Sequence, residues 1–123
     1  MAGFNSAMTE LIFGQDSATL KDDRVRTIQT PGGTGALRVC ADLIKEAQPN
    51  ATVWASDPTL ANHNAIFPAA GLGMQSYAYF DPQSSSLRFD AMMDDLASRG
   101  PGDVVLFHAC CHNPCGVSPN PEQ

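Results

Sequence analysis

Large apolar residues recur at helical spacing in four parts of the chain. Phe4, Met8, Leu11 and Ile12 mark the first part, and similar stripes follow further along. Spacings of three and four residues place such side chains on one face of a helix. The pattern predicts helices over residues 1–13, 37–47, 58–70 and 89–96, which Gly14, Pro49, Gly71 and Gly100 respectively end.

Short runs of β-branched, aromatic or alternating residues separate these helices and predict strands. The expected strands cover residues 24–29, 52–56, 75–80 and 104–107, and we expect polar loops over 15–23 and 81–86. The run 104–107 is continuously apolar, which is typical of a strand covered on both faces. Strands that alternate with helices predict an α/β fold with a mostly parallel sheet, in which ligands bind beyond the carboxyl ends of the strands.

Composition restricts the class of protein. The chain has 123 residues, of which 43% are hydrophobic and 16% charged, with a net charge of -6. These values predict one globular domain. The sequence has no Lys/Arg cluster of the kind that binds nucleic acid. Its apolar runs are shorter than the ~20 residues that a membrane span needs. The first residues lack the features of a signal peptide, so we expect a cytoplasmic protein without nucleic-acid or membrane partners.

A glycine-rich turn precedes the second expected helix. It contains Gly32, Gly33, Thr34 and Gly35. Glycines let successive backbone N–H groups face one anion, and the helix that follows adds the positive end of its dipole. The spacing matches neither a Walker loop nor a dinucleotide-binding fingerprint. The turn therefore predicts a phosphate site of another kind, with a simple structural turn as the alternative.

The loop after the last expected strand concentrates histidine and cysteine. Residues 108–116 contain His108, Cys110, Cys111, His112 and Cys115. A metal-binding module is one interpretation, although structural zinc sites usually separate two ligand pairs by a longer loop. We favour reduced, buried thiols at a strand end, with no metal. Asn113-Pro114 is different, because an asparagine in a turn beyond a strand can present its amide to a ligand.

These motifs together resemble the fold-type I pyridoxal-phosphate aminotransferases, in the aspartate and aromatic amino acid branch. The resemblance covers nearly the whole chain. It is carried by ordered blocks at residues 29–38 (QTPGGTGALR), 53–63, 77–81, 87–90 and 104–116. It implies a three-layer α/β/α arrangement and a single partial cofactor-binding (large) domain over residues 1–123, truncated at its C-terminal end.

The resemblance also implies roles for particular residues. Gly32, Gly33 and Thr34 would hold the phosphate of pyridoxal 5′-phosphate, and Asn113 would hydrogen-bond the phenolic oxygen of its ring. His63 would support the carboxylate that pairs with the pyridine nitrogen. Leu60 stands where the family has a tryptophan that stacks on the ring.

Two departures from the family pattern bear on this site. An aromatic stacking pair contributes about 0.5–1.5 kcal/mol beyond burial, so Leu60 should hold the ring less firmly. Trp54 is expected in the core and does not replace the missing ring. Cys115 stands where the family has threonine, which puts one local hydrogen bond in doubt.

The chain contains only two lysines, Lys21 and Lys45. Transamination needs a lysine that binds the cofactor covalently and moves the substrate proton. Neither lysine is expected near the carboxyl ends of the strands, and no catalytic residue is assigned in this chain. We therefore expect a fragment of a transaminase that is inactive alone.

The parent enzyme would transfer an amino group from aspartate or an aromatic amino acid to a 2-oxo acid, and would be a homodimer. A non-catalytic truncated subunit that pairs with full-length chains is the alternative, together with the metal-binding module.

Overall fold

The computed structural model describes residues 2–123 and divides them into two compact units. The first unit ends at Ala36 and the second is Leu37–Gln123. The boundary falls inside one helix, α3 (Gly32–Ala47), whose first residues are the glycine-rich turn.

The first unit contains helices α1 (Ala2–Phe13) and α2 (Ala18–Lys21). The expected first helix is confirmed over Ala2–Phe13, with Met1 outside the described residues. The loop expected over 15–23 is partly wrong, since α2 lies within it. Gly14 has φ +80°, which suits the residue that ends α1.

The strand expected over residues 24–29 is wrong: no strand is assigned within this described stretch. Side chains of α1, and not a neighbouring strand, hydrogen-bond this segment. The Asn5 amide Nδ2 donates to the Thr27 carbonyl at 3.0 Å, and the hydroxyls of Thr9 and Thr27 share a hydrogen bond. A side-chain partner of this kind satisfies the backbone without a ladder.

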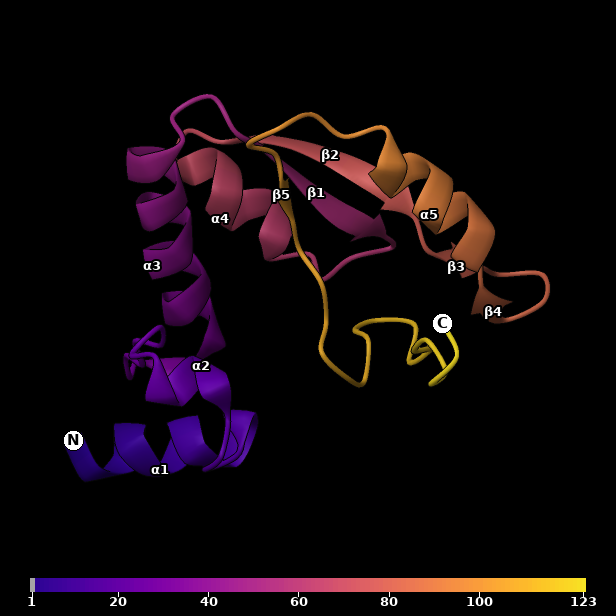
Figure 1. Ribbon diagram of the computed structural model, residues 1–123. Helices are drawn as coiled ribbons and strands as arrows, with labels where there is room; N and C mark the ends of the chain where they lie inside the picture. The colour runs from indigo at the N-terminus through magenta and orange to yellow at the C-terminus, as the bar shows by residue number, and fades with distance from the viewer. Residues whose placement is uncertain (1) are drawn as a thin grey trace. The chain divides into compact units, whose positions relative to one another are not determined.

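The second unit is built on a parallel sheet in the strand order β2-β1-β5. The strands are β1 (Thr52–Asp57), β2 (Gly73–Ala78) and β5 (Val104–Val105) (Figure 1). Both neighbours run parallel to β1, with Thr52 opposite Gly73 and Val53 opposite Val104. The parallel sheet predicted from the sequence is confirmed.

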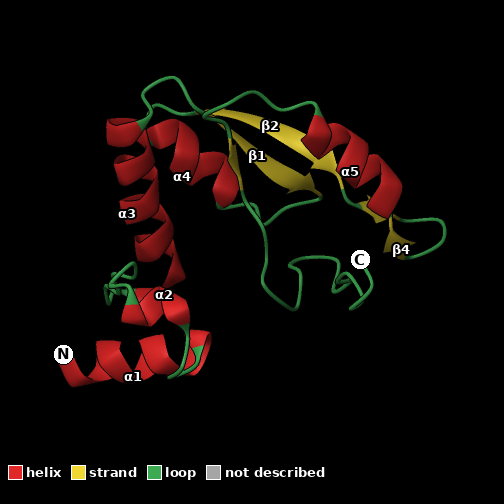
Figure 2. Cartoon of the chain, viewed as in Figure 1, coloured by secondary structure: helices red, strands yellow, loops and turns green. Residues whose placement is uncertain are grey.

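Helices cover both faces of this sheet. On one face, α3 and α4 (His63–Ala69) enclose a core; its buried residues are Ala41, Ala51, Val53, Ile66, Phe67 and Leu72. On the other, α5 (Phe89–Ala97) packs over Tyr77 and Tyr79 through Met92. Figure 2 shows the sheet with its helices, and this confirms the α/β class with helix, sheet and helix layers.

Several element ends differ from the expectations. Helix α4 begins at His63 after the N-cap Asn62, not at Pro58, and residues 58–62 form a bend and a turn instead. Strand β2 ends at Ala78, and a hairpin of β3 (Phe80–Asp81) and β4 (Ser86–Leu87) follows.

The last strand is shorter and less covered than expected. The pairing of β5 continues for one hydrogen bond, from Leu106 N to Trp54 O at 2.8 Å, and Phe107 is 57% exposed. Trp54 is only partly buried: its Nε1 donates to Asp103 at 3.1 Å, and the Arg99 guanidinium lies 3.5 Å from its ring centre. The prediction of a core tryptophan is therefore confirmed only in part: the ring packs against the core of Tyr77, Tyr79 and Met92 and stays partly exposed.

Candidate functional site at the carboxyl ends of the strands

Three histidines from two separate segments come together at the carboxyl ends of the strands. His63 is the first residue of α4, and His108 and His112 lie in the loop after β5. The ring centres of His63 and His108 are 5.7 Å apart, and those of His108 and His112 are 4.5 Å apart. We call these three side chains the histidine cluster.

His63 is held in place within this cluster. It is 4% exposed, and its Nδ1 lies 2.8 Å from the Thr59 hydroxyl. Phe67 meets the ring edge-on, one helical turn further along α4. Burial, and after it the neighbouring His108, lower the pKa of His63 below its ordinary value. The imidazole is therefore a neutral, oriented group near pH 7.

His112 is buried more completely, at 3% exposed. Its Nε2 lies 2.8 Å from the hydroxyl of Ser56, a residue of β1, and its Nδ1 lies 3.0 Å from the Cys115 sulfur. The ring stacks on Tyr79 with centres 4.0 Å apart. Burial, then the charges of His108 and His63, lower the pKa of His112.

His108 carries a polar atom without a partner. Its Nδ1 is buried and has no hydrogen-bond partner within the described residues. A buried donor or acceptor left unpaired costs about 1–3 kcal/mol. Such an atom between two other histidines marks a place where a ligand or a further segment would supply the missing partner.

Tyr77 of β2 and Tyr79, just after this strand, hold the loop that follows β5 against the sheet. The Tyr77 hydroxyl donates to the Leu106 carbonyl at 3.0 Å, and the Tyr79 hydroxyl donates to the Val117 carbonyl at 2.9 Å. Burial raises the pKa of Tyr77 to about 12, and burial also raises the pKa of Tyr79. Both phenols therefore remain protonated donors across the neutral range.

Asn113 and Leu60 lie next to members of the cluster. Asn113 directly follows His112 and is exposed; the peptide bond to Pro114 is cis. Leu60 is partly buried in the turn before α4, and its carbonyl accepts from the backbone N–H of His63 at 2.9 Å. An aliphatic side chain at this position offers an apolar surface without an aromatic face.

The glycine-rich turn has the backbone of an anion cradle. Gly32 has φ +74°, and a Cβ at Gly32 or at Gly33 would meet nothing within 4 Å. A Cβ at Gly35 would come within 3.2 Å of the Pro31 ring. Because Gly32 and Gly33 begin the long helix α3, which has no acidic residue in its first turn, this terminus suits a negatively charged group.

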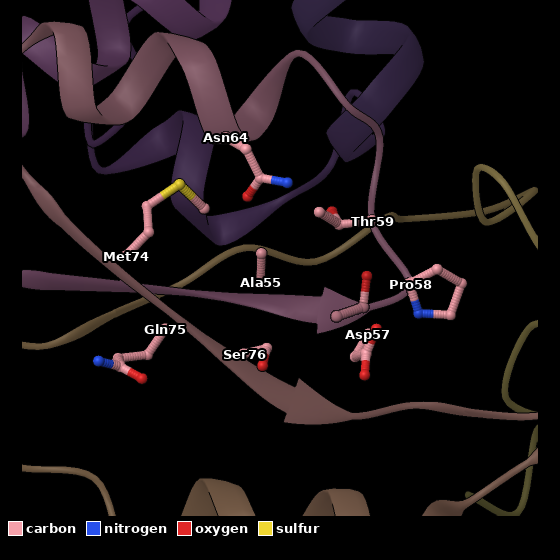
Figure 3. A pocket seen from close by; sticks show the side chains of 9 residues that line it. Ala55, Asp57, Pro58, Thr59, Asn64, Met74, Gln75 and Ser76 are labelled. Atoms are coloured by element: carbon pink, nitrogen blue, oxygen red, sulfur yellow. The ribbon is translucent and has the colours of Figure 1, made fainter.

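An open hollow of about 540 Å³ lies along β1 and β2, as Figure 3 shows. Its lining includes Ser56, Asp57, Thr59 and Asn64. None of the site residues expected from the sequence lines it, although Thr59 joins it to His63 through their hydrogen bond. We take the histidine cluster as the candidate site, because hydrogen bonds and ring contacts hold the side chains of His63 and His112 in place.

The two lysines are engaged elsewhere. Lys45 Nζ donates to the carbonyls of Pro49 and Gly71, at 2.7 and 2.9 Å. Lys21 lies 3.6 Å from the Asp16 carboxylate on the surface of the first unit. Both amino groups therefore already have polar partners.

The cysteines differ from the expectation of buried thiols. All four are free, Cys110 and Cys111 are exposed, and Cys115 is half-buried. Within residues 2–123, no group of three or more potential metal ligands is arranged to hold an ion. In the same part of the chain, no helix is long and apolar enough to cross a bilayer.

Sequence reasoning singled out His63 and Asn113 but missed how their neighbours connect. His108 and His112 entered only as possible metal ligands, and Ser56, Thr59 and the two tyrosines were given no role. The signal was available for the tyrosines, since the strand expected over residues 75–80 would place Tyr77 and Tyr79 on one face. The bond from Ser56 to His112 joins residues far apart in sequence and leaves no local pattern.

A parallel α/β domain with polar side chains at the carboxyl ends of its strands is typical of proteins that bind a ligand there. Comparison with known proteins specifies the family. A family model described as aminotransferase class I and II matches residues 2–123. The chain therefore belongs to the aminotransferase class I and II family.

Named relatives support the same assignment. The chain is 50% identical over 120 residues to an aspartate aminotransferase of Salmonella typhi, covering 98% of this chain and 30% of the relative. It is 43% identical over 122 residues to a tyrosine aminotransferase of Klebsiella pneumoniae, covering 99% and 31%.

A solved structure is similar over the same region. It is an aromatic-amino-acid aminotransferase from Burkholderia pseudomallei covalently bound to pyridoxal phosphate, with a TM-score of 0.96 and 40% identity. The match covers 99% of this chain and 31% of that chain. The chain thus spans about 30% of the length of the relatives it matches.

Proposed function

We propose that this chain is the part of a pyridoxal-phosphate-dependent aminotransferase that holds the cofactor without binding it covalently. The whole protein would transfer an amino group from aspartate or an aromatic amino acid to a 2-oxo acid. Similarity to aspartate, tyrosine and aromatic aminotransferases supports this proposal. The observation that carries it is the histidine cluster at the strand ends, with the buried Nδ1 of His108 that has no hydrogen-bond partner among the described residues.

The residues present fit the cofactor. An anion fits the terminus of α3, because Gly32 and Gly33 leave open space where a side chain would otherwise stand. Asn113 is exposed, so its amide is accessible to a ring oxygen. Bound there, pyridoxal phosphate would supply the electron sink that amino-group transfer needs.

Each of the chain's own residues then has a defined task. Gly32, Gly33 and Thr34 bind the phosphate, and Asn113 donates its amide to the ring oxygen. His63, whose Nδ1 meets the Thr59 hydroxyl, is oriented so that it can support a carboxylate from elsewhere in the protein. Leu60 contacts the ring with an apolar but not aromatic surface.

The two lysines, whose amino groups could bind the cofactor covalently, are engaged in other contacts. Lys45 is bound to two backbone carbonyls and Lys21 faces Asp16. Charge-assisted hydrogen bonds contribute about 1.5–3 kcal/mol each, and association entropy offsets much of that gain. We therefore propose weak, non-covalent binding and no turnover by this chain, with homodimer formation and a cytoplasmic location for the whole protein.

The phosphate turn is tested by comparing two ligands. Fluorescence titration of the chain should give tighter binding for pyridoxal phosphate than for pyridoxal, by about tenfold or more if one to two charge-assisted bonds are lost. Thr34→Val should reduce the difference, whereas Ser118→Ala, at an exposed hydroxyl outside the turn, should leave it unchanged. Equal affinity for the two ligands would contradict the assignment of the turn.

A further inference from the structure

Cys115 is paired with a buried imidazole by a tight turn. The backbone N–H of Gly116 donates to the His112 carbonyl at 2.7 Å, and Gly116 has φ +73°. This turn brings the Cys115 sulfur back to 3.0 Å from His112 Nδ1. The thiol thus makes a local hydrogen bond of its own.

The imidazole is fixed on its other sides. Its Nε2 meets the hydroxyl of Ser56, which is 2% exposed, at 2.8 Å. Tyr79 stacks on the ring with an interplanar angle of 15°. Since a thiol is a weak acceptor, the arrangement that satisfies all partners has Nδ1 accepting from the thiol and Nε2–H donating to Ser56.

The surroundings keep this imidazole available as a base. The ionisable groups that face the pair are Tyr79 from the end of β2, His108 from the same loop and His63 from α4. Burial and the two other histidines disfavour the imidazolium, so the ring is neutral near pH 7. A neutral, oriented imidazole beside a thiol is the arrangement that activates a cysteine nucleophile.

We propose that Cys115 is a nucleophilic thiol, activated by His112 as general base, that exchanges with small-molecule disulfides. The sulfur attacks one sulfur of the disulfide, a new S–S bond forms, and the original S–S bond breaks. The thiol proton passes to His112 Nδ1 and then to the departing thiolate. The products are a mixed disulfide at Cys115 and one small thiol.

The remaining cysteines serve as internal controls. Cys40, Cys110 and Cys111 are exposed, and no histidine contact like that of Cys115 is seen for them among the described residues. The pKa of the Cys110 thiol is raised by its neighbour Cys111. Exposure alone would therefore favour reaction at the other three, and preferential reaction at half-buried Cys115 would identify the histidine as the cause.

The test uses the full chain, with bis(2-hydroxyethyl) disulfide as the probe and peptide mass spectrometry as the readout. The modification rate of each cysteine is measured from pH 6 to pH 9, in the native chain and in His112→Gln. Cys115 should react fastest at pH 7 and level off near neutral pH, while the rate at Cys40 rises throughout. In His112→Gln the Cys115 rate should fall by about tenfold or more, with Cys40 unchanged.

An unchanged Cys115 rate in His112→Gln, or a Cys115 profile parallel to that of Cys40, would overturn the proposal. Circular dichroism checks that the variant folds. If it does not fold, the pH profile of Cys115 in the native chain is used instead. A second variant, Ser56→Ala, removes the partner of His112 Nε2 and should also slow the reaction of Cys115. A binding failure with pyridoxal phosphate does not affect this outcome, because the exchange involves no cofactor.

Discussion

Individual histidines carry the electrostatic character of the site. His63 and His112 are buried and hydrogen-bonded, His63 through one ring nitrogen and His112 through both. Burial and the neighbouring His108 disfavour the charged form of each ring. Sequence spacing alone placed His63 on the buried face of a helix correctly. It could not reveal the lowered pKa values, because these depend on residues that meet only in the folded chain.

The stability of the chain should fall as the pH drops below about 6.5, the ordinary histidine pKa. The pKa values of His63 and His112 are lowered by folding, so the unfolded chain takes up protons first and is favoured by acid. Urea unfolding at pH 7.5, 6.5 and 5.5 measures this decline. His63→Gln should lower the stability at pH 7.5 but flatten its pH dependence. The same slope in the variant and the native chain would contradict this account.

At the scale of elements, the helices and buried strands followed from periodicity, and their ends did not. The apolar stripes of α3 and α5 are strong and local. The start of α4 depended on the turn over residues 58–62. The conformation of residues 24–29 depended on contacts with Asn5 and Thr9, which leave no signature in the segment itself.

The start of α3 depends on a glycine in the left-handed region. Gly32→Ala should destabilise the folded chain by about 1–2 kcal/mol, the penalty for a side chain at positive φ. Gly33→Ala is the matched control: its φ is not in that region and its Cβ position is open, so a helix former should raise stability by about 0.4–1 kcal/mol. Denaturant unfolding separates the two, and equal effects would contradict the assigned backbone.

Asp103 joins the beginning of β5 to β1. Its carboxylate accepts from the Thr52 backbone at 3.3 Å, from Trp54 Nε1 at 3.1 Å and from the Gly100 backbone at 3.3 Å. Asp103→Ala should destabilise the chain by about 1.5–3 kcal/mol. Asp94→Ala, an exposed acid on α5, should stay within about 0.5 kcal/mol of the native value. A similar loss in both variants would mean that the effect is one of net charge.

At the scale of the whole molecule, the chain belongs to the aminotransferase class I and II family, and both of its lysines already have polar partners. The resemblance seen in the ordered motifs of the sequence agrees with the family match over residues 2–123 and with coverage of about 30% of each relative. The α/β class and the parallel sheet were predictable because alternating helices and strands allow few arrangements. The histidine cluster was only half predictable, since it joins the first residue of α4 to the loop after β5.

Reaction of the chain with pyridoxal phosphate and borohydride, followed by peptide mass spectrometry, tests the central claim most directly. Borohydride fixes any lysine that has bound the cofactor covalently. The account predicts only trace labelling of Lys21 and Lys45, equal to the labelling by pyridoxal, and no amino transfer between aspartate and 2-oxoglutarate. Stoichiometric, phosphate-dependent labelling of either lysine, accompanied by turnover, would contradict it.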